Sequence, residues 1–117
     1  MHEALFDDTF LKDTGVSTLD IAKAMLDEGY HPMTMYFPLV VHGAMLIEPT
    51  ESESKDSLDA FIASLRHLAL LAKKGDQAAF FHAAPRLTPR RRLDETRAAR
   101  TPILRWKPPA PAAQAAE

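Results

Sequence analysis

Residues 31–54 constrain the fold of this chain more than any other stretch. They contain two short apolar runs, 35–41 and 44–47, with β-branched and aromatic side chains, each too short to form a helix that stands alone. Gly43 separates the two runs, which therefore predict an antiparallel pair of strands. Because Pro38 has no N–H to donate to a sheet, we expect the first run to be an edge strand or to break at Pro38.

A helix is predicted over residues 18–28, before this stretch. Ser17 and Asp20 have the spacing of a capping box, in which each side chain bonds the backbone N–H of the other residue. Apolar side chains then gather on one side, and Gly29 ends the pattern.

A longer helix is predicted after residues 31–54. Its apolar side chains follow three- and four-residue steps and end just before Gly75, which suits the residue that follows a helix. Thr50, Ser52 and Ser54 are all able to cap its first turn, and the sequence leaves that choice open. The stripe comprises Leu58, Phe61, Ile62, Leu65, Leu68, Ala69 and Ala72.

The remaining segments carry weaker patterns. Residues 2–6 predict a strand, 76–82 one or two helical turns, 83–92 a loop and 93–100 a short helix. Residues 108–117 are rich in alanine and proline and are expected to form a disordered tail after a single domain at 1–107. Since both long helices need one face covered, the prediction is a small α+β domain, with an antiparallel or mixed sheet and helices on one side.

Composition excludes several classes of protein. The chain has 117 residues and no cysteine, so disulfides and thiolate metal sites are excluded. No apolar run approaches the roughly 20 residues of a membrane span, so we expect no membrane partner and a cytoplasmic location. The four glycines stand alone, and no glycine-rich loop that would cradle a phosphate is present.

Charge is divided unevenly along the chain. Residues 1–60 carry twelve acids and three bases, and residues 61–117 carry eleven bases and four acids. This division predicts that the two parts attract each other or a protein neighbour. Arg90, Arg91 and Arg92 lie at the centre of the basic part and are predicted to contact a partner. Asp94 and Glu95 interrupt the run, which argues against a nucleic-acid surface.

Few residues have a pattern that points to chemistry. The five histidines have no metal-binding spacing among themselves, so no metal site is predicted. The acids near residue 50 flank a helix start, where the positive end of the helix dipole favours them, and capping explains them better than catalysis. His31, which precedes Pro32 in a loop, is the histidine that we expect nearest to a site, although a backbone-bonded loop histidine explains it equally well.

Several blocks, taken in order, resemble the C-terminal part of the glycine cleavage system P-protein, specifically the second subunit of its two-subunit form. The resemblance runs from about His2 to Trp106. The blocks are Thr-Gly-Val-Ser-Thr-Leu-Asp-Ile-Ala-Lys (14–23), Gly-Tyr-His-Pro-Met-Thr (29–34), Tyr-Phe-Pro-Leu-Val-Val (36–41), Glu-Pro-Thr-Glu-Ser-Glu-Ser-Lys (48–55), Leu-Asp-Ala-Phe-Ile (58–62), Ala-Pro (84–85), Arg-Arg-Leu-Asp-Glu (91–95) and Leu-Arg-Trp (104–106).

This resemblance implies the small C-terminal domain of a fold-type I enzyme that depends on pyridoxal 5′-phosphate. Such an enzyme, a glycine dehydrogenase (decarboxylating), removes the carboxylate of glycine and passes the aminomethyl group to the lipoyl arm of the carrier H-protein. Its implied partners are the large cofactor domain, the other subunit and the H-protein. Within that frame His31, Thr34 and Tyr36 are predicted to wall the substrate site, and the basic segment to brace the partner subunit or the carrier.

The family's cofactor lysine follows a histidine in the large domain, and none of the lysines here has that context. We therefore expect no catalytic or cofactor-binding residue in this chain, and a fragment that is inactive alone. A stand-alone interaction module that kept the fold and lost the chemistry is the alternative function.

Overall fold

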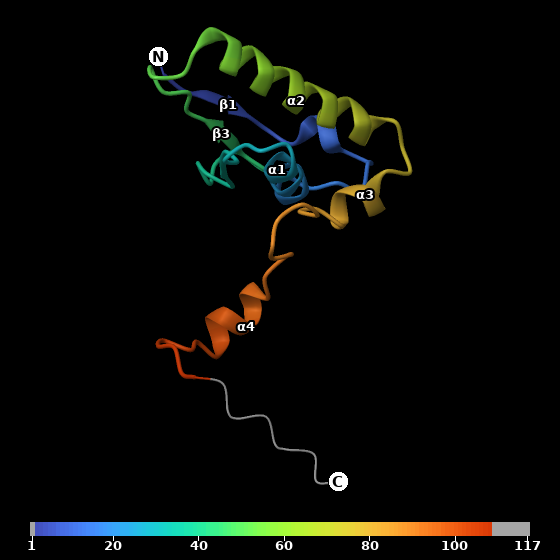
Figure 1. The fold of residues 1–117 in the computed structure, drawn as a ribbon. Coiled ribbons are helices and arrows are strands. Elements are labelled where there is room, and N and C mark those ends of the chain that lie inside the picture. The colour runs from blue at the N-terminus through green and yellow to red at the C-terminus, as the bar shows by residue number, and fades with distance from the viewer. Residues whose placement is uncertain (1, 109–117) are drawn as a thin grey trace.

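The computed structural model describes residues 2–108 (Figure 1). Short strands and helices alternate in the first half, and helices follow in the second. In chain order the elements are β1 (Ala4–Phe6), the 3-10 turn η1 (Thr9–Leu11), α1 (Thr18–Asp27), β2 (Thr34–Met35), β3 (Met45–Ile47), α2 (Lys55–Lys73), α3 (Ala78–His82) and α4 (Glu95–Arg100).

The sheet has three antiparallel strands in the order β1-β3-β2. Met45 lies opposite Phe6 on one side and Met35 on the other, so these three side chains share a face. Met45, which is 2% exposed, belongs to the core cluster that also contains residues of α1 and α2. The prediction of a small α+β domain with an antiparallel sheet and helices on one side is confirmed.

Helix α1 lies at the centre of the core. Ile21 and Met25 on α1 are fully buried, and they pack with Leu68 of α2, Phe81 of α3 and Met45 of β3. Figure 1 shows α1 near the middle of the body formed by the sheet, α2 and α3, with α4 standing away from it. Three elements therefore bury their apolar faces against one ten-residue helix.

The predicted helix starts are found in the structure. The Ser17 hydroxyl accepts a hydrogen bond from the N–H of Asp20, and the Asp20 carboxylate accepts one from the N–H of Ser17, which completes the capping box. For α2 the cap is Ser54, whose hydroxyl accepts from the N–H of Ser57 at 3.1 Å, and this decides among the three open alternatives.

The weaker predictions after Gly75 have mixed outcomes. A short helix occupies residues 78–82, a loop occupies 83–92, and α4 lies within the predicted 93–100. The expected disordered tail at 108–117 lies outside the described residues apart from Pro108, so the boundary at 107 stays a prediction. Within residues 2–108, no helix combines the length and the apolar character needed to cross a bilayer.

The predicted strand over residues 35–41 is wrong beyond Met35. The N–H of Tyr36 still bonds the carbonyl of Ala44 at 2.8 Å, but Tyr36 then turns the chain away with a φ of 62°. Leu39 and Val40 are 80% and 91% exposed. Pro38 cannot donate to the sheet and its carbonyl closes a turn with Val41, so the apolar run forms an exposed loop.

This loop returns to the body at Gly43. The Gly43 carbonyl accepts a buried hydrogen bond of 2.7 Å from the Thr18 hydroxyl. The backbone of Gly43 has a φ of 59°. A Cβ at this position would lie 2.1 Å from the Asp8 side chain. The neighbouring His42 Nδ1 lies 2.9 Å from Asp8 Oδ1, so one aspartate meets both residues at the end of the loop.

Replacing Gly43 by alanine should destabilise the chain by about 3 kcal/mol, the sum of a left-handed backbone and a collision with Asp8. Gly29→Ala is the matched control, because Gly29 has a φ of 87° but no neighbouring atom within 4 Å of the place that a Cβ would occupy. It should cost only about 1–2 kcal/mol. Urea unfolding measures both, and equal losses would show that the Asp8 contact is unimportant.

The pKa of His42 should lie above its ordinary value of 6.5, because its hydrogen bond to Asp8 and then the negative charge of that carboxylate favour the protonated ring. The stability that this pair contributes is present below pH 6.5 and is lost as pH rises through the raised pKa. An NMR titration of the ring protons measures it. Asp8→Asn should return the His42 pKa towards its ordinary value, and an unchanged midpoint would contradict the assignment.

Candidate functional site

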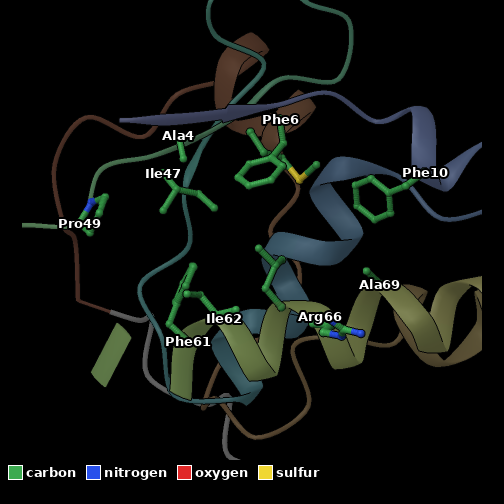
Figure 2. A pocket seen from close by; sticks show the side chains of 11 residues that line it. Ala4, Phe6, Phe10, Ile47, Pro49, Phe61, Ile62, Arg66 and Ala69 are labelled. Carbon is green, nitrogen blue, oxygen red and sulfur yellow. The ribbon is translucent and has the colours of Figure 1, made fainter. Parts of the chain in front are cut away.

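Two grooves lie side by side along α2, one at its first turns and one at its middle. The first, called the apolar groove, has a volume of about 430 Å³ and opens between the sheet and α2. Figure 2 shows Phe6, Ile47 and Phe10 facing Phe61 and Ile62 across it. Arg66 is the only charged residue in its lining, which comprises Ala4, Phe6, Phe10, Met45, Ile47, Pro49, Phe61, Ile62, Leu65, Arg66 and Ala69. The apolar groove therefore suits an apolar side chain and carries no acid–base pair.

The second groove, called the His31 groove, has a volume of about 360 Å³. It lies between the loop after α1, the end of β3 and the first turns of α2. Its lining is more polar and comprises Tyr30, His31, Pro32, Met33, Thr34, Leu46, Ile47, Glu48, Pro49, Thr50, Glu53, Ser57 and Phe61. Ile47, Pro49 and Phe61 line both grooves, and the Phe61 ring meets the Tyr30 ring edge-on at a centroid distance of 5.3 Å.

The structure brings together two of the three predicted wall residues. His31 and Thr34 line the His31 groove, and both side chains are exposed. Tyr36 lies outside its lining, and its hydroxyl accepts a hydrogen bond of 3.3 Å from the N–H of Leu19 at the start of α1. Only five positions separate His31 from Tyr36 in the sequence, but the backbone turn at Tyr36, which the sequence did not indicate, directs the two side chains to different places.

Glu48 and Glu53 join His31 in this groove, although the sequence indicated only helix-start acids. Both carboxylates are exposed to solvent, as is the His31 ring. Together they supply one imidazole, two carboxylates and the hydroxyl of Thr34 along a wall open to water. Such a wall can orient a polar ligand through hydrogen bonds, whereas acid–base catalysis by these groups needs a covering surface that excludes water.

The basic segment after α3 is held to α1 at two points. At the C-terminal end of α1, the Asp27 carboxylate accepts hydrogen bonds from the backbone N–H groups of Arg86 and Leu87, at 2.7–2.8 Å. The Arg86 guanidinium lies 3.5 Å from the same carboxylate and 3.9 Å from the centroid of the Phe80 ring. These contacts order the first half of the predicted loop.

At the N-terminal end of α1, Arg92 makes the second attachment. Its Nη2 donates to Asp20 Oδ1 at 2.6 Å and to the carbonyl of Phe81 at 2.9 Å, and its Nε donates to the carbonyl of Ala84 at 2.8 Å. Asp20 is only 4% exposed, and its other oxygen accepts from Ser17. One carboxylate thus caps α1 and holds the basic segment.

The pKa of Asp20 lies below its ordinary value of 3.8. Burial alone raises this pKa, but the hydrogen bonds from the side chain and backbone of Ser17, together with the hydrogen bond and positive charge of Arg92, outweigh burial. Asp20 is therefore ionised at neutral pH, and the Arg92 guanidinium is its charged partner.

The three arginines of the predicted partner contact differ in their surroundings. Arg92 is occupied inside the chain, as described above. Arg91 Nη1 donates to the carbonyl of Pro85 at 3.2 Å, and Arg90 is exposed. The attraction predicted between the acidic and basic parts is present within the chain, through Asp20 and Asp27. The charge division was the signal for it, but the sequence did not show which aspartates take part.

The described residues place His2, Glu3 and Glu48 with potential metal-ligand atoms within 4.8 Å of one another. All three are exposed, and exposed acidic groups of this kind are common without an ion.

The comparison with protein families decides what the domain is. Residues 1–82 match the family model described as "Glycine dehydrogenase, C-terminal domain". The chain belongs to this family.

Relatives among curated proteins agree with the family match. A "Probable glycine dehydrogenase (decarboxylating) subunit 2" from Caulobacter vibrioides is 71% identical over 117 residues, which is all of this chain and 22% of the relative. Proteins of the same name from Kosmotoga olearia and Caldanaerobacter subterraneus are 51% and 48% identical, over 92% and 91% of the chain and 22% and 21% of their own lengths. The chain spans about a fifth of the length of these relatives.

The lysines of this glycine dehydrogenase C-terminal domain decide whether it fits pyridoxal phosphate. Neither the apolar groove nor the His31 groove has a lysine in its lining. Five of the six lysines are exposed, and Lys23, the half-buried one, lies beside Arg92 in a shallow polar depression. Neither of the two grooves therefore supplies a lysine that could hold the cofactor.

Arg92→Met should destabilise the domain by about 2–3 kcal/mol, because it leaves the buried Asp20 carboxylate without its charged partner. Arg90→Met is the matched control and should change stability by less than about 0.5 kcal/mol, since Arg90 is exposed. Urea unfolding at pH 7 measures both. A low pKa for Asp20 means that its contribution is lost as pH falls below 3.8, so the difference between Arg92→Met and the parent chain should shrink there. Equal losses for the two variants would contradict the attachment.

Proposed function

We propose that this chain is the small C-terminal domain of subunit 2 of the glycine cleavage P-protein. In the whole enzyme, glycine is decarboxylated with pyridoxal phosphate and its aminomethyl group is passed to the lipoyl arm of the H-protein. The observation that carries this proposal is the match over all 117 residues to a relative named glycine dehydrogenase (decarboxylating) subunit 2.

The proposal divides the work between this domain and the rest of the protein. Pyridoxal phosphate supplies the electron sink for loss of the carboxylate, and the remainder of the polypeptide holds it. The small domain contributes a polar wall, and the isolated chain is inactive. The linings of both grooves, which contain no lysine, support this division.

His31 and Thr34 form the part of this wall that faces the active-site mouth. They share one open groove with Glu48 and Glu53, and a large domain seated over the groove would exclude water from all four side chains. Tyr36 serves the same wall only indirectly: its hydrogen bond to the N–H of Leu19 holds the start of the exposed loop beside α1.

The partners of the domain are the rest of the P-protein and the H-protein. Arg90 and Arg91 make the proposed partner contact, because Arg92 is already bound to Asp20 inside the domain. Their exposed positive charges suit an acidic surface of either partner.

A chimera tests the function. The chain replaces the matching fifth of the Caulobacter vibrioides relative, and exchange of the glycine carboxyl with bicarbonate is measured in the presence of the other subunit, the H-protein and pyridoxal phosphate. The chimera should be active, while the isolated chain should show no exchange and should not retain the cofactor through gel filtration. An inactive, folded chimera would favour the alternative, a stand-alone interaction module.

In the active chimera, His31→Asn should lower kcat/KM by about tenfold or more through loss of a positioning contact. His67→Asn, at an exposed position of α2 outside both grooves, is the control and should leave kcat/KM unchanged. If both variants keep full activity, His31 does not wall the site.

A further inference from the structure

The segment after Arg92, called the C-terminal arm (residues 93–107), leaves the body of the domain with its apolar side chains in water. Leu93, Ile103, Leu104 and Trp106 are 70–91% exposed, and α4 buries none of its residues. Figure 1 shows α4 and the described residues that follow it, up to 108, leading away from α1, α2 and α3. Four large apolar side chains on one projecting segment are unusual for a surface that has no partner.

The composition of the C-terminal arm is that of an interface rather than of a linker. Tryptophan and arginine dominate the energetic centres of protein interfaces, and isoleucine and leucine fill the pockets around them. Here Ile103, Leu104 and Trp106 are interleaved with Arg105 and Lys107. The arm also contains Arg97 and Arg100 against the acids Asp94 and Glu95, so its net charge is positive.

The point where the C-terminal arm leaves the domain is fixed. Arg92 is bound to Asp20 and to two carbonyl groups, so the residue just before the arm cannot drift. Anchoring one end of a docking segment lowers the entropy that it loses on binding. The contacts of Arg92 therefore fix the position on the domain from which the arm starts.

The extent of the match to related proteins indicates which protein the C-terminal arm belongs to. The family match ends at residue 82, before the arm begins. The Caldanaerobacter relative matches over 106 residues of this 117-residue chain, and any such stretch includes residues 12–106 wherever it starts. The match to this relative therefore extends through the arm as far as position 106, and this chain is only 21% of the relative's length. The arm thus belongs to the whole subunit, most of which lies outside this chain.

We propose that the C-terminal arm is a docking segment that binds the remainder of glycine dehydrogenase subunit 2. Ile103, Leu104 and Trp106 enter an apolar cleft there, and the surrounding arginines meet an acidic rim. This inference rests on the proposed function. A second copy is the poorer occupant, because Arg66 is the only charge in the apolar groove and repels the arginines of an incoming arm.

Hydrogen exchange in the active chimera tests the proposal. Amides of residues 93–107 should exchange at least about tenfold more slowly in the chimera than in the isolated chain, because docking buries them. Trp106→Ala should remove most of this protection. Leu70→Ala is the matched control, because Leu70 is 53% exposed on α2 and lies outside the arm. The melting temperature of the isolated chain should be unchanged by Trp106→Ala, which separates lost docking from lost folding.

The results distinguish this proposal from the proposed function. Equal exchange of the arm in the chimera and in the isolated chain would overturn the docking proposal, whether or not the chimera is active. A protected arm in an inactive chimera would uphold the docking and overturn the function. Trp106 is the only tryptophan in the chain, so its fluorescence reports self-association of the isolated chain directly. A blue shift that grows with protein concentration would assign the arm to a second copy and overturn the proposal.

Discussion

The contacts of the Asp20 carboxylate with Ser17 and Arg92 are the interactions on which the rest of the domain depends. This carboxylate completes the capping box that starts α1, and α1 is the helix against which β3, α2 and α3 bury their largest side chains. The same carboxylate binds Arg92, which in turn bonds two carbonyl groups at and just after α3. The buried carboxylate is tolerated because each of its two oxygens accepts a hydrogen bond. Removing one donor leaves the free-energy cost of burying the charge uncompensated. The start of α1 and the attachment of the segment around Arg92 to α1 therefore depend on the same side chain.

Sequence reasoning succeeded where a local signal determines the structure. The capping box at Ser17, the stop at Gly29 and the long apolar stripe of α2 are all local, and the corresponding elements form as predicted. It failed over residues 35–41, where a continuous apolar run indicated a strand. A run of that kind predicts that its side chains are covered, but it does not indicate whether a sheet of this chain or another surface covers them, and here Leu39 and Val40 are exposed.

The candidate site was predictable only in part for a related reason. His31 and Thr34 were placed together because they lie close in sequence, before a strand. Glu48 and Glu53 join them through the fold, across the end of β3, and no pattern within the chain signals that meeting. For the arginines the sequence showed the charge division, but only the structure separates Arg92, a buried-acid partner, from the exposed Arg90. Successive arginines in one run can thus have different roles.

The single aromatic ring of Phe61 forms a shared wall between the apolar groove and the His31 groove. It contacts the ring of Tyr30, the residue next to His31, so the packing of the Phe61 ring reaches the polar groove through one aromatic neighbour. A substitution at Phe61 therefore alters the walls of both grooves at once, and neither groove can be reshaped there without the other.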